Sequence, residues 1–273
     1  MTLFQSILLG IVQGLTEFLP VSSSGHLVIV PRLLGWNIPS DEAFVFNVLV
    51  QVATLVAVIA YFWKDLVAII QAVISGLVKR QPFTDPQARL GWLIAAATIP
   101  AGIFGLLVKD QVERAFTSLL ATGVFLLVTA GLLTLAERLG KRQNELESLT
   151  LKDAILIGLA QALAIFPGVS RSGATITGGM LRNLERSAAA RFSFLMSIPI
   201  MLAAGLLAAL DLLEMPNFSQ LLPVFIPGFV AAAVTGYLSI RWLLQYLTRR
   251  PLTIFAVYCL AIGALSIGVS FFG

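Results

Sequence analysis

The sequence predicts an all-α polytopic membrane protein with six transmembrane helices plus two re-entrant helix-turn-helix hairpins, arranged as an inverted-topology repeat. Two observations support this fold class. The 273 residues are 58% hydrophobic and only 12% charged, about half the charge of an ordinary soluble domain. Residues 7–25 and 155–173 also align without a gap, 148 positions apart, with ten of nineteen columns identical. We therefore treat residues 1–273 as a single integral membrane domain with two internal repeats, about 1–136 and about 151–273.

Six apolar stretches have the length of a spanning helix, which needs roughly 20 apolar residues to cross a bilayer about 30 Å thick. They cover about residues 44–63, 90–108, 116–136, 192–211, 221–241 and 252–272. A shorter segment, 66–78, carries apolar residues at helical spacing opposite Gln71 and Ser75. We expect it to be an amphipathic helix on the membrane surface. The single cysteine, Cys259, excludes an intrachain disulfide.

Two further apolar segments, 3–34 and 151–182, are interrupted by Leu19–Pro20 and by Pro167–Gly168. Their halves are too short to cross a bilayer, so each segment is expected to enter and leave on the same side as a re-entrant hairpin. Broken backbone is tolerated at that depth only where protein or a water-filled cavity surrounds it. A pair of broken helices in two repeated halves indicates a binding site where they meet.

The distribution of lysine and arginine predicts the orientation. Counting spans places the loops 64–89, 137–152, 182–191 and 241–250 on one side, and these hold fourteen of the eighteen Lys and Arg residues. The positive-inside rule makes that side cytoplasmic and places both termini on the outer side. The net charge of +4 is therefore explained by topology and does not indicate nucleic-acid binding. Three spans separate the two hairpins, so one hairpin is inverted relative to the other, and their tips are expected to meet near mid-membrane.

Glu17 is the only one of the fourteen acidic residues that lies deep in an apolar segment. A buried acid costs about 2.5–3.5 kcal/mol on insertion scales, so it needs a partner or a function. Gln13 lies four residues earlier, on the same helix face. Two interpretations stay open. The pair forms polar contacts between helices, or it belongs to a phosphate site, where a carboxylate suits Mg²⁺ or Ca²⁺.

His26, the only histidine, follows three serines and a glycine. If a helix restarts near Ser22, then Ser23 and His26 form an i, i+3 pair on one face. Their contact would activate Ser23 as a nucleophile. Equally, His26 could be the nucleophile or the general acid while Ser23 binds substrate. The plainer alternative is that the serines only cap a helix.

Arg171 lies at the tip of the second hairpin, where the first hairpin has Ser23. Glycines permit close approach, and a restarting helix directs its N–H groups at the tip. Arginine binds phosphate oxygens bidentately and keeps its charge. The predicted anion-binding tip comprises Gly168, Ser170, Arg171, Ser172, Gly173 and Thr175. The alternative is an Arg171–Glu17 ion pair that joins the hairpins, which is compatible with function if substrate breaks the pair.

An acid, a histidine, hydroxyls and an arginine that converge within a membrane suit a phosphorylated lipid, because phosphoryl transfer needs positioning and charge neutralisation. At these residues the chain resembles the undecaprenyl-diphosphatase family, also called the bacitracin-resistance protein family. The resemblance rests on the spacing of Gln13 and Glu17, on the segment FLPVSSSGH that follows it (residues 18–26), and on the segment PGVSRSGAT (residues 167–175). It runs essentially end to end, and the family also accepts glutamate in place of Gln13.

The resemblance implies hydrolysis of undecaprenyl diphosphate to undecaprenyl phosphate, which recycles the lipid carrier for cell-wall synthesis and confers resistance to bacitracin. It also implies a bacterial cytoplasmic membrane protein whose active site opens to the outer side, with a divalent cation, Mg²⁺ or Ca²⁺. The expected partners are a polyprenyl diphosphate lipid and the bilayer, with no nucleic acid, and a homodimer stays open.

On this basis we expect Arg171, with Ser170, Ser172 and Thr175 and the glycines Gly168 and Gly173, to bind the diphosphate. Glu17, helped by Gln13, would hold the metal or orient the attacking group. Ser23 and His26 would supply nucleophile and acid or base. The rival hypothesis is a polyprenyl-phosphate flippase without hydrolysis, because inverted repeats are typical of transporters. The unlike residues in the two copies favour an enzyme.

Overall fold

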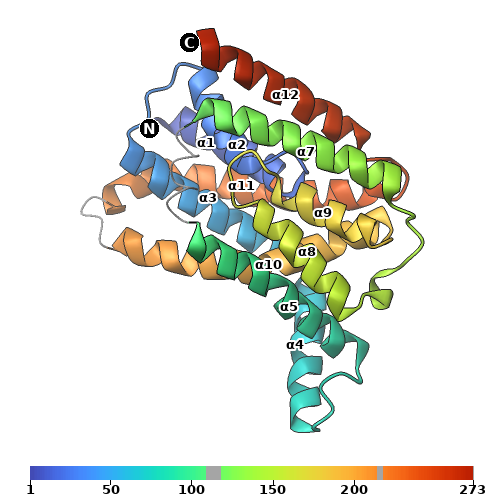
Figure 1. The fold of residues 1–273 in the computed structure, drawn as a ribbon. Coiled ribbons are helices and arrows are strands. Elements are labelled where there is room, and N and C mark those ends of the chain that lie inside the picture. Colours follow the sequence, from blue (N-terminus) through green and yellow to red (C-terminus); the bar gives the residue numbers. More distant parts are fainter. Residues whose placement is uncertain (109–117, 214–217, 273) are drawn as a thin grey trace.

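The computed structural model describes residues 1–108, 118–213 and 218–272. Figure 1 shows these residues as a bundle of helices with the N- and C-termini at the same end of the molecule. The helices are α1 (Leu3–Phe18), α2 (Ser23–Leu33), α3 (Ser40–Tyr61), α4 (Trp63–Val78), α5 (Pro86–Leu107), α7 (Leu119–Leu139), α8 (Leu151–Leu163), α9 (Arg171–Leu181), α10 (Arg186–Leu213), α11 (Phe218–Leu247) and α12 (Thr253–Phe272). A short 3₁₀ turn, Leu146–Ser148, precedes α8.

Six of these helices are long and apolar enough to cross a membrane: α3, α5, α7, α10, α11 and α12. Within the described residues these helices confirm the six predicted spans, although the predicted start of the third, at 116, lies outside that part of the chain. Several helices run beyond the apolar stretch. For example, α10 begins at Arg186 and α11 continues to Leu247. Hydropathy marks only the part suited to hydrocarbon, whereas the helical hydrogen bonds continue into the polar flanks.

Both predicted interruptions are breaks between separate helices, α1 and α2 in one case, α8 and α9 in the other. The two copies also start alike, because Thr2 and Thr150, 148 positions apart, each form a capping box with the residue three positions later. Capping boxes satisfy backbone donors that a helix start leaves free. The second halves start alike too, since Ser22 and Ser170 accept hydrogen bonds from the amides of Gly25 and Gly173. The two repeats therefore share the hydrogen bonds at the starts of their helices as well as their sequence.

The two hairpins exchange packing partners between the halves of the chain. Helix α1 packs on α11, and α8 packs on α5. A Cβ atom at Gly10 would clash with the backbone of Gly228, and one at Gly158 would clash with the backbone of Ala97. Glycine is thus required at equivalent positions, because the first arm of each hairpin lies against the backbone of a helix from the other half.

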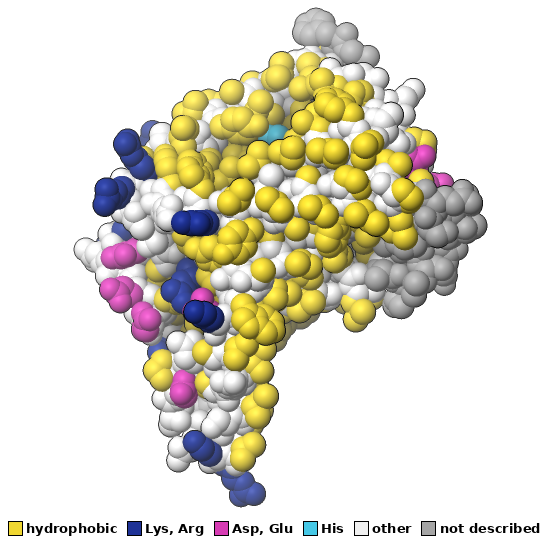
Figure 2. Space-filling model, turned by 180° about the vertical axis from the view of Figure 1, so that it is seen from behind, with side chains coloured by type: hydrophobic (Ala, Val, Ile, Leu, Met, Phe, Trp, Pro, Cys, Tyr) yellow, Lys and Arg dark blue, Asp and Glu magenta, His cyan; other side chains and the backbone are white. Residues whose placement is uncertain are grey.

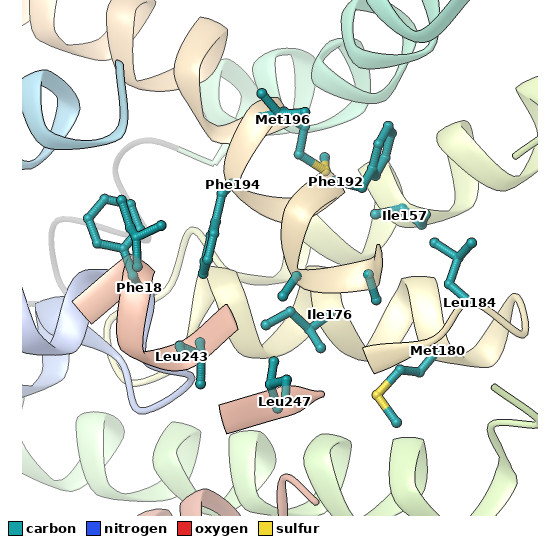
Figure 3. Packing of buried hydrophobic residues seen from close by; sticks show 14 of the residues in the cluster. Phe18, Ile157, Ile176, Met180, Leu184, Phe192, Phe194, Met196, Leu243 and Leu247 are labelled. Atoms are coloured by element: carbon teal, nitrogen blue, oxygen red, sulfur yellow. The ribbon is translucent and has the colours of Figure 1, made fainter. Parts of the chain in front are cut away.

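A shared hydrophobic core holds the breaks in place. Figure 3 shows Phe18 at the end of α1 beside Phe194 of α10, with Ile176 of α9 and Leu243 of α11 in the same cluster. All four side chains are fully buried, and the rings of Phe18 and Phe194 meet edge to face with centroids 5.4 Å apart. Such interiors are packed as densely as organic crystals, so the core fixes both hairpin tips relative to α10.

The amphipathic segment predicted at 66–78 is part of α4, a 16-residue helix. Figure 1 shows α4 projecting from the bundle beside the start of α5. Its side chain Ile69 is buried, whereas Ile70, Ile74 and Leu77 are exposed. The segment is too short to cross a bilayer, as predicted, and Ile70, Ile74 and Leu77 form an exposed apolar stripe at helical spacing. Its location on the membrane surface stays a prediction.

Candidate functional site

Glu17 is the centre of a hydrogen-bonded cluster that draws on both hairpins. Its Oε2 accepts hydrogen bonds from Gln13 Nε2 at 2.9 Å and from Ser23 Oγ at 2.6 Å. Its Oε1 accepts a hydrogen bond from Arg171 Nη2 at 2.7 Å. The Arg171–Glu17 ion pair, one of the two predicted alternatives for Arg171, is therefore present, and it joins residues 154 positions apart. The hydrogen bonds also bring the predicted residues Gln13, Ser23 and Arg171 together.

The first break explains how Ser23 reaches Glu17. Helix α1 ends at Phe18, one residue after Glu17, and α2 begins at Ser23. Between them Ser22 has φ = 69°, a left-handed conformation that non-glycine residues rarely adopt. The side chain of Ser22 caps α2, which offsets part of the strain. The reversal places the first residue of α2 directly against the last turn of α1.

The second break places Arg171 by a comparable device. Gly168 has φ = 100° and lies against Thr122, so a Cβ atom there would be both strained and obstructed. Thr129 Oγ1 donates a hydrogen bond to the carbonyl of Gly168 and accepts one from the amide of Ser170. Helix α7 thus holds the turn through two hydrogen bonds, one to the carbonyl of Gly168 and one from the amide of Ser170. Arg171 is the first residue of α9 and is directed at α1.

The predicted hydroxyl groups of the second tip are occupied by protein partners. Ser170 Oγ accepts a hydrogen bond from the amide of Gly173 at 3.1 Å and caps α9. Ser172 Oγ donates to the carbonyl of Leu19 at 3.1 Å, and so links the two breaks. Thr175 Oγ1 donates to the carbonyl of Arg171 at 2.8 Å. The three side chains are almost fully buried, so their present contacts hold the backbone around Arg171.

His26 does not contact Ser23, contrary to one of the arrangements that the spacing allows. Its Nδ1 lies 2.7 Å from the carbonyl of Ser22, and its Nε2 lies 2.7 Å from Tyr258 Oη on α12. A carbonyl can only accept, so Nδ1 carries a hydrogen and donates to Ser22, while Nε2 and the phenol of Tyr258 share a hydrogen bond. The Ser23 hydroxyl is bound to Glu17 instead. The i, i+3 spacing alone could not predict this, because Glu17 competes for the same hydroxyl.

The site retains polar atoms without protein partners. Arg171 Nη1 and Gln13 Oε1 are buried and have no hydrogen-bond partner among the described residues. The Arg171 side chain is 15% exposed and that of Glu17 is 7% exposed. A buried donor without a partner costs free energy that a bound anion would recover. The first-turn amides of α2 and α9 also lack intrahelical partners by geometry, so both helix starts favour an anion between the hairpins.

A divalent cation needs several oxygen ligands. No group of three His, Cys, Asp or Glu residues capable of holding a metal ion occurs in the described part of the chain. The cluster nevertheless offers one carboxylate, Glu17, and an unpartnered amide oxygen, Gln13 Oε1. Magnesium sites commonly use one or two carboxylates together with substrate phosphates and waters. The residues therefore fit a cation that is shared with a phosphorylated ligand.

Sequence reasoning missed three residues of the site. Tyr258 is 40% exposed and stacks on His26 with an interplanar angle of 9°. Met201 of α10 contacts Arg171 Nη2 through its sulfur at 3.7 Å. Thr129 holds the second turn. These residues lie in apolar spans whose periodicity indicates only membrane crossing, so no local sequence signal distinguishes them. In Figure 2 the histidine is visible only as a small patch between hydrophobic side chains, because His26 is 5% exposed.

The fold and the site together define a polytopic membrane protein with a charged, partly desolvated cluster where two broken helices meet. The family described as "Bacitracin resistance protein BacA" matches residues 6–265. The chain is 48% identical over 276 residues to an undecaprenyl-diphosphatase of Chlorobium phaeovibrioides, covering 97% of this chain and 96% of that protein. It is 48% identical over 272 residues to an undecaprenyl-diphosphatase of Chlorobaculum tepidum, covering 96% and 95%. An undecaprenyl-diphosphatase of Thermomicrobium roseum is 44% identical over 279 residues, 99% of each chain. The chain belongs to this family.

Proposed function

We propose that this protein hydrolyses undecaprenyl diphosphate to undecaprenyl phosphate and inorganic phosphate, and so recycles the lipid carrier for cell-wall synthesis. The family and the names of its relatives support this activity. The observation that carries it in the structure is the convergence of Ser23 and Arg171 on the carboxylate of Glu17. An acid, a hydroxyl and a guanidinium within hydrogen-bonding distance provide the charge neutralisation and positioning that phosphoryl transfer needs.

The proposed setting is the bacterial cytoplasmic membrane, with the two broken segments as re-entrant hairpins in an inverted-topology repeat. Three features support this arrangement. Both termini lie at one end of the bundle (Figure 1), Lys and Arg side chains gather at the opposite end and on the arm (Figure 2), and the hairpins exchange packing partners between the halves. By the positive-inside rule the basic end would be cytoplasmic and the termini would lie on the outer side. The family resemblance adds the proposal that the site also opens to the outer side.

Arg171 is the proposed ligand of the diphosphate. Among the described residues its guanidinium is paired with one carboxylate, that of Glu17, through Nη2, while Nη1 stays unpartnered. A phosphate group can therefore bind at Nη1 and compete for Nη2, because phosphate matches the planar donors of arginine. Ser170, Ser172 and Thr175 hold the tip in shape, and Gly168 and Gly173 let the backbone approach. Their hydroxyls would contact substrate only after exchanging their present partners.

Glu17 is the proposed proton acceptor of the site. The Ser23 hydroxyl already donates to Oε2 at 2.6 Å, which favours Glu17 over His26 as the group that activates Ser23 or a water molecule in its place. Attack on the terminal phosphorus breaks its bond to the bridging oxygen, and that oxygen leaves with the lipid phosphate. Attack by water releases inorganic phosphate directly, whereas attack by Ser23 forms a phosphoserine that a water molecule then hydrolyses to serine and inorganic phosphate. His26, held by Ser22 and Tyr258, would exchange a proton with the phosphate groups.

A divalent cation is a further part of this proposal. Glu17 and Gln13 would hold it, because their oxygens are the hard ligands that Mg²⁺ and Ca²⁺ prefer. When bound, the cation would neutralise charge on the phosphate oxygens.

The experiment measures inorganic phosphate released from undecaprenyl diphosphate by the detergent-purified protein, with and without a chelator, beside Arg171→Ala. We expect metal-dependent release by the native protein and at least a 10²-fold loss in the variant, roughly the effect of removing one transition-state donor. Monodisperse native protein that releases no phosphate would contradict hydrolysis and favour the carrier hypothesis. Release at the native rate by Arg171→Ala would contradict the proposed role of Arg171 and leave the hydrolysis itself supported.

A further inference from the structure

Helix α9 also lines a cavity that lies outside the cluster around Glu17. A cavity of about 470 Å³ lies among α5, α7, α8 and α9, within the size range of about 300–1,000 Å³ that is usual for ligand pockets. Its walls are apolar apart from one threonine, and Leu159 and Leu163 of α8, both about half exposed, form its outer margin. No charged side chain lines it, so it suits a hydrocarbon chain.

The cavity is continuous with the proposed phosphate ligand along one helix face. Ala174, Gly178 and Leu181 line the cavity, and they lie three, seven and ten residues after Arg171 on α9. Residues at this spacing share one stripe of an α-helix. At about 1.5 Å per residue, the stripe leads from the guanidinium along the cavity wall. A lipid whose phosphate binds Arg171 could therefore extend its chain along this face.

The internal repeat relates the cavity to an equivalent region in the first half of the chain. At the 148-residue offset, cavity residue Ala174 corresponds to His26, and Leu163 corresponds to Leu15. The cavity is thus the counterpart, in the second half, of the region around Leu15 and His26 in the first half. The second copy carries a methyl group in place of the imidazole. It retains an apolar opening without the residue that would do chemistry there.

From these observations we infer that the cavity binds the isoprenoid chain of a polyprenyl phosphate lipid, separately from the site at Glu17. This inference rests on the proposed function for the identity of the lipid. In the proposed inverted repeat, the cavity and the corresponding region around His26 belong to opposite halves of the membrane. The site therefore accepts the product chain on the far side from hydrolysis, with Arg171 at the junction of both sites.

The test uses a polyprenyl monophosphate that carries a photoreactive diazirine in its chain, bound to the full-length protein in detergent. We expect cross-links in the segments 159–163 and 174–181. Leu163→Trp, which fills the margin of the cavity, should lower their yield about tenfold, as expected when a bulky group obstructs a hydrophobic pocket. Leu156→Trp is the matched control, because Leu156 is an exposed leucine on α8 that does not line the cavity.

If Leu163→Trp fails to yield a monodisperse protein, Leu159→Trp takes its place. Cross-links that are unchanged by the cavity variant, or that are displaced equally by an excess of phosphatidylglycerol, would overturn the inference. Phosphate release is measured on the same samples. A native protein that cross-links in the cavity but releases no phosphate would contradict the proposed function and leave the binding site standing, so the two failures are distinguishable.

Discussion

Replacing Glu17 with glutamine isolates the negative charge of the site from its hydrogen bonds. Glutamine has nearly the same shape, and its amide oxygen can still accept from Arg171 Nη2. The new NH₂ group would face the donors of Gln13 and Ser23, but both can adapt. The Gln13 amide can turn its unpartnered Oε1 toward it, and a hydroxyl can accept as well as donate. The network thus survives, and the carboxylate charge is what Glu17→Gln removes.

The structure allows the magnitude to be bounded. Glu17 and Arg171 are 7% and 15% exposed at their side chains, so the pair is largely desolvated. Removing one partner of a buried pair leaves an uncompensated charge and costs about 3–5 kcal/mol of stability. The same change removes the proposed proton acceptor, which typically contributes about 10²–10⁴-fold to the rate. We therefore expect both a less stable protein and a strong loss of turnover.

The assay combines phosphate release under saturating undecaprenyl diphosphate with the unfolding midpoint in denaturant. Glu137→Gln is the matched control, because Glu137 pairs with Arg142 and Arg186 and accepts from the amide of Leu252 outside the site. It should destabilise the protein and leave turnover per folded molecule near the native value. A Glu17→Gln protein that turns over at the rate of the control would refute the assignment of Glu17 as proton acceptor.

Three other variants test separate parts of the account. Arg171→Lys keeps the charge but loses the planar donors, so kcat/KM should fall about 10²-fold, as measured by phosphate release. Tyr258→Phe removes the hydrogen-bond partner of His26 Nε2. We expect kcat to fall about tenfold, KM to stay unchanged and the pH–rate profile to be displaced. An unchanged pH–rate profile would show that Tyr258 contributes only packing. Gly168→Ala forces a Cβ into a backbone with φ = 100° against Thr122 and should lower the free energy of unfolding by about 1–3 kcal/mol or more.

Much of the fold could be predicted from the sequence because the bilayer restricts the solutions. Apolar length alone located the six spanning helices, and a proline located each helix break. The repeat added information that single segments lack, since the 148-residue offset also relates the capping residues Ser22 and Ser170. Exact helix ends could not be predicted, because they depend on hydrogen bonding in the polar flanks.

The site was predictable only where polar residues stand out against an apolar background. Gln13, Glu17 and Arg171 stand out in this way, and the structure brings them together. The partner of His26 could not be predicted. Tyr258 is 232 residues away, and a tyrosine in a spanning helix is unremarkable in composition. The choice of Ser23 between His26 and Glu17 depends on the turn at Ser22, which the sequence does not specify.

The most direct test of the central claim is a structure of the protein with a non-hydrolysable methylene diphosphonate analogue of the lipid substrate. The account predicts the terminal phosphonate between the two helix breaks, within hydrogen-bonding distance of Arg171 Nη1 and adjacent to Ser23, with the Arg171–Glu17 contact lengthened or broken. A diphosphonate bound elsewhere, with the Arg171–Glu17 pair at its present distance of 2.7 Å, would contradict the claim that the two hairpin tips form the catalytic site.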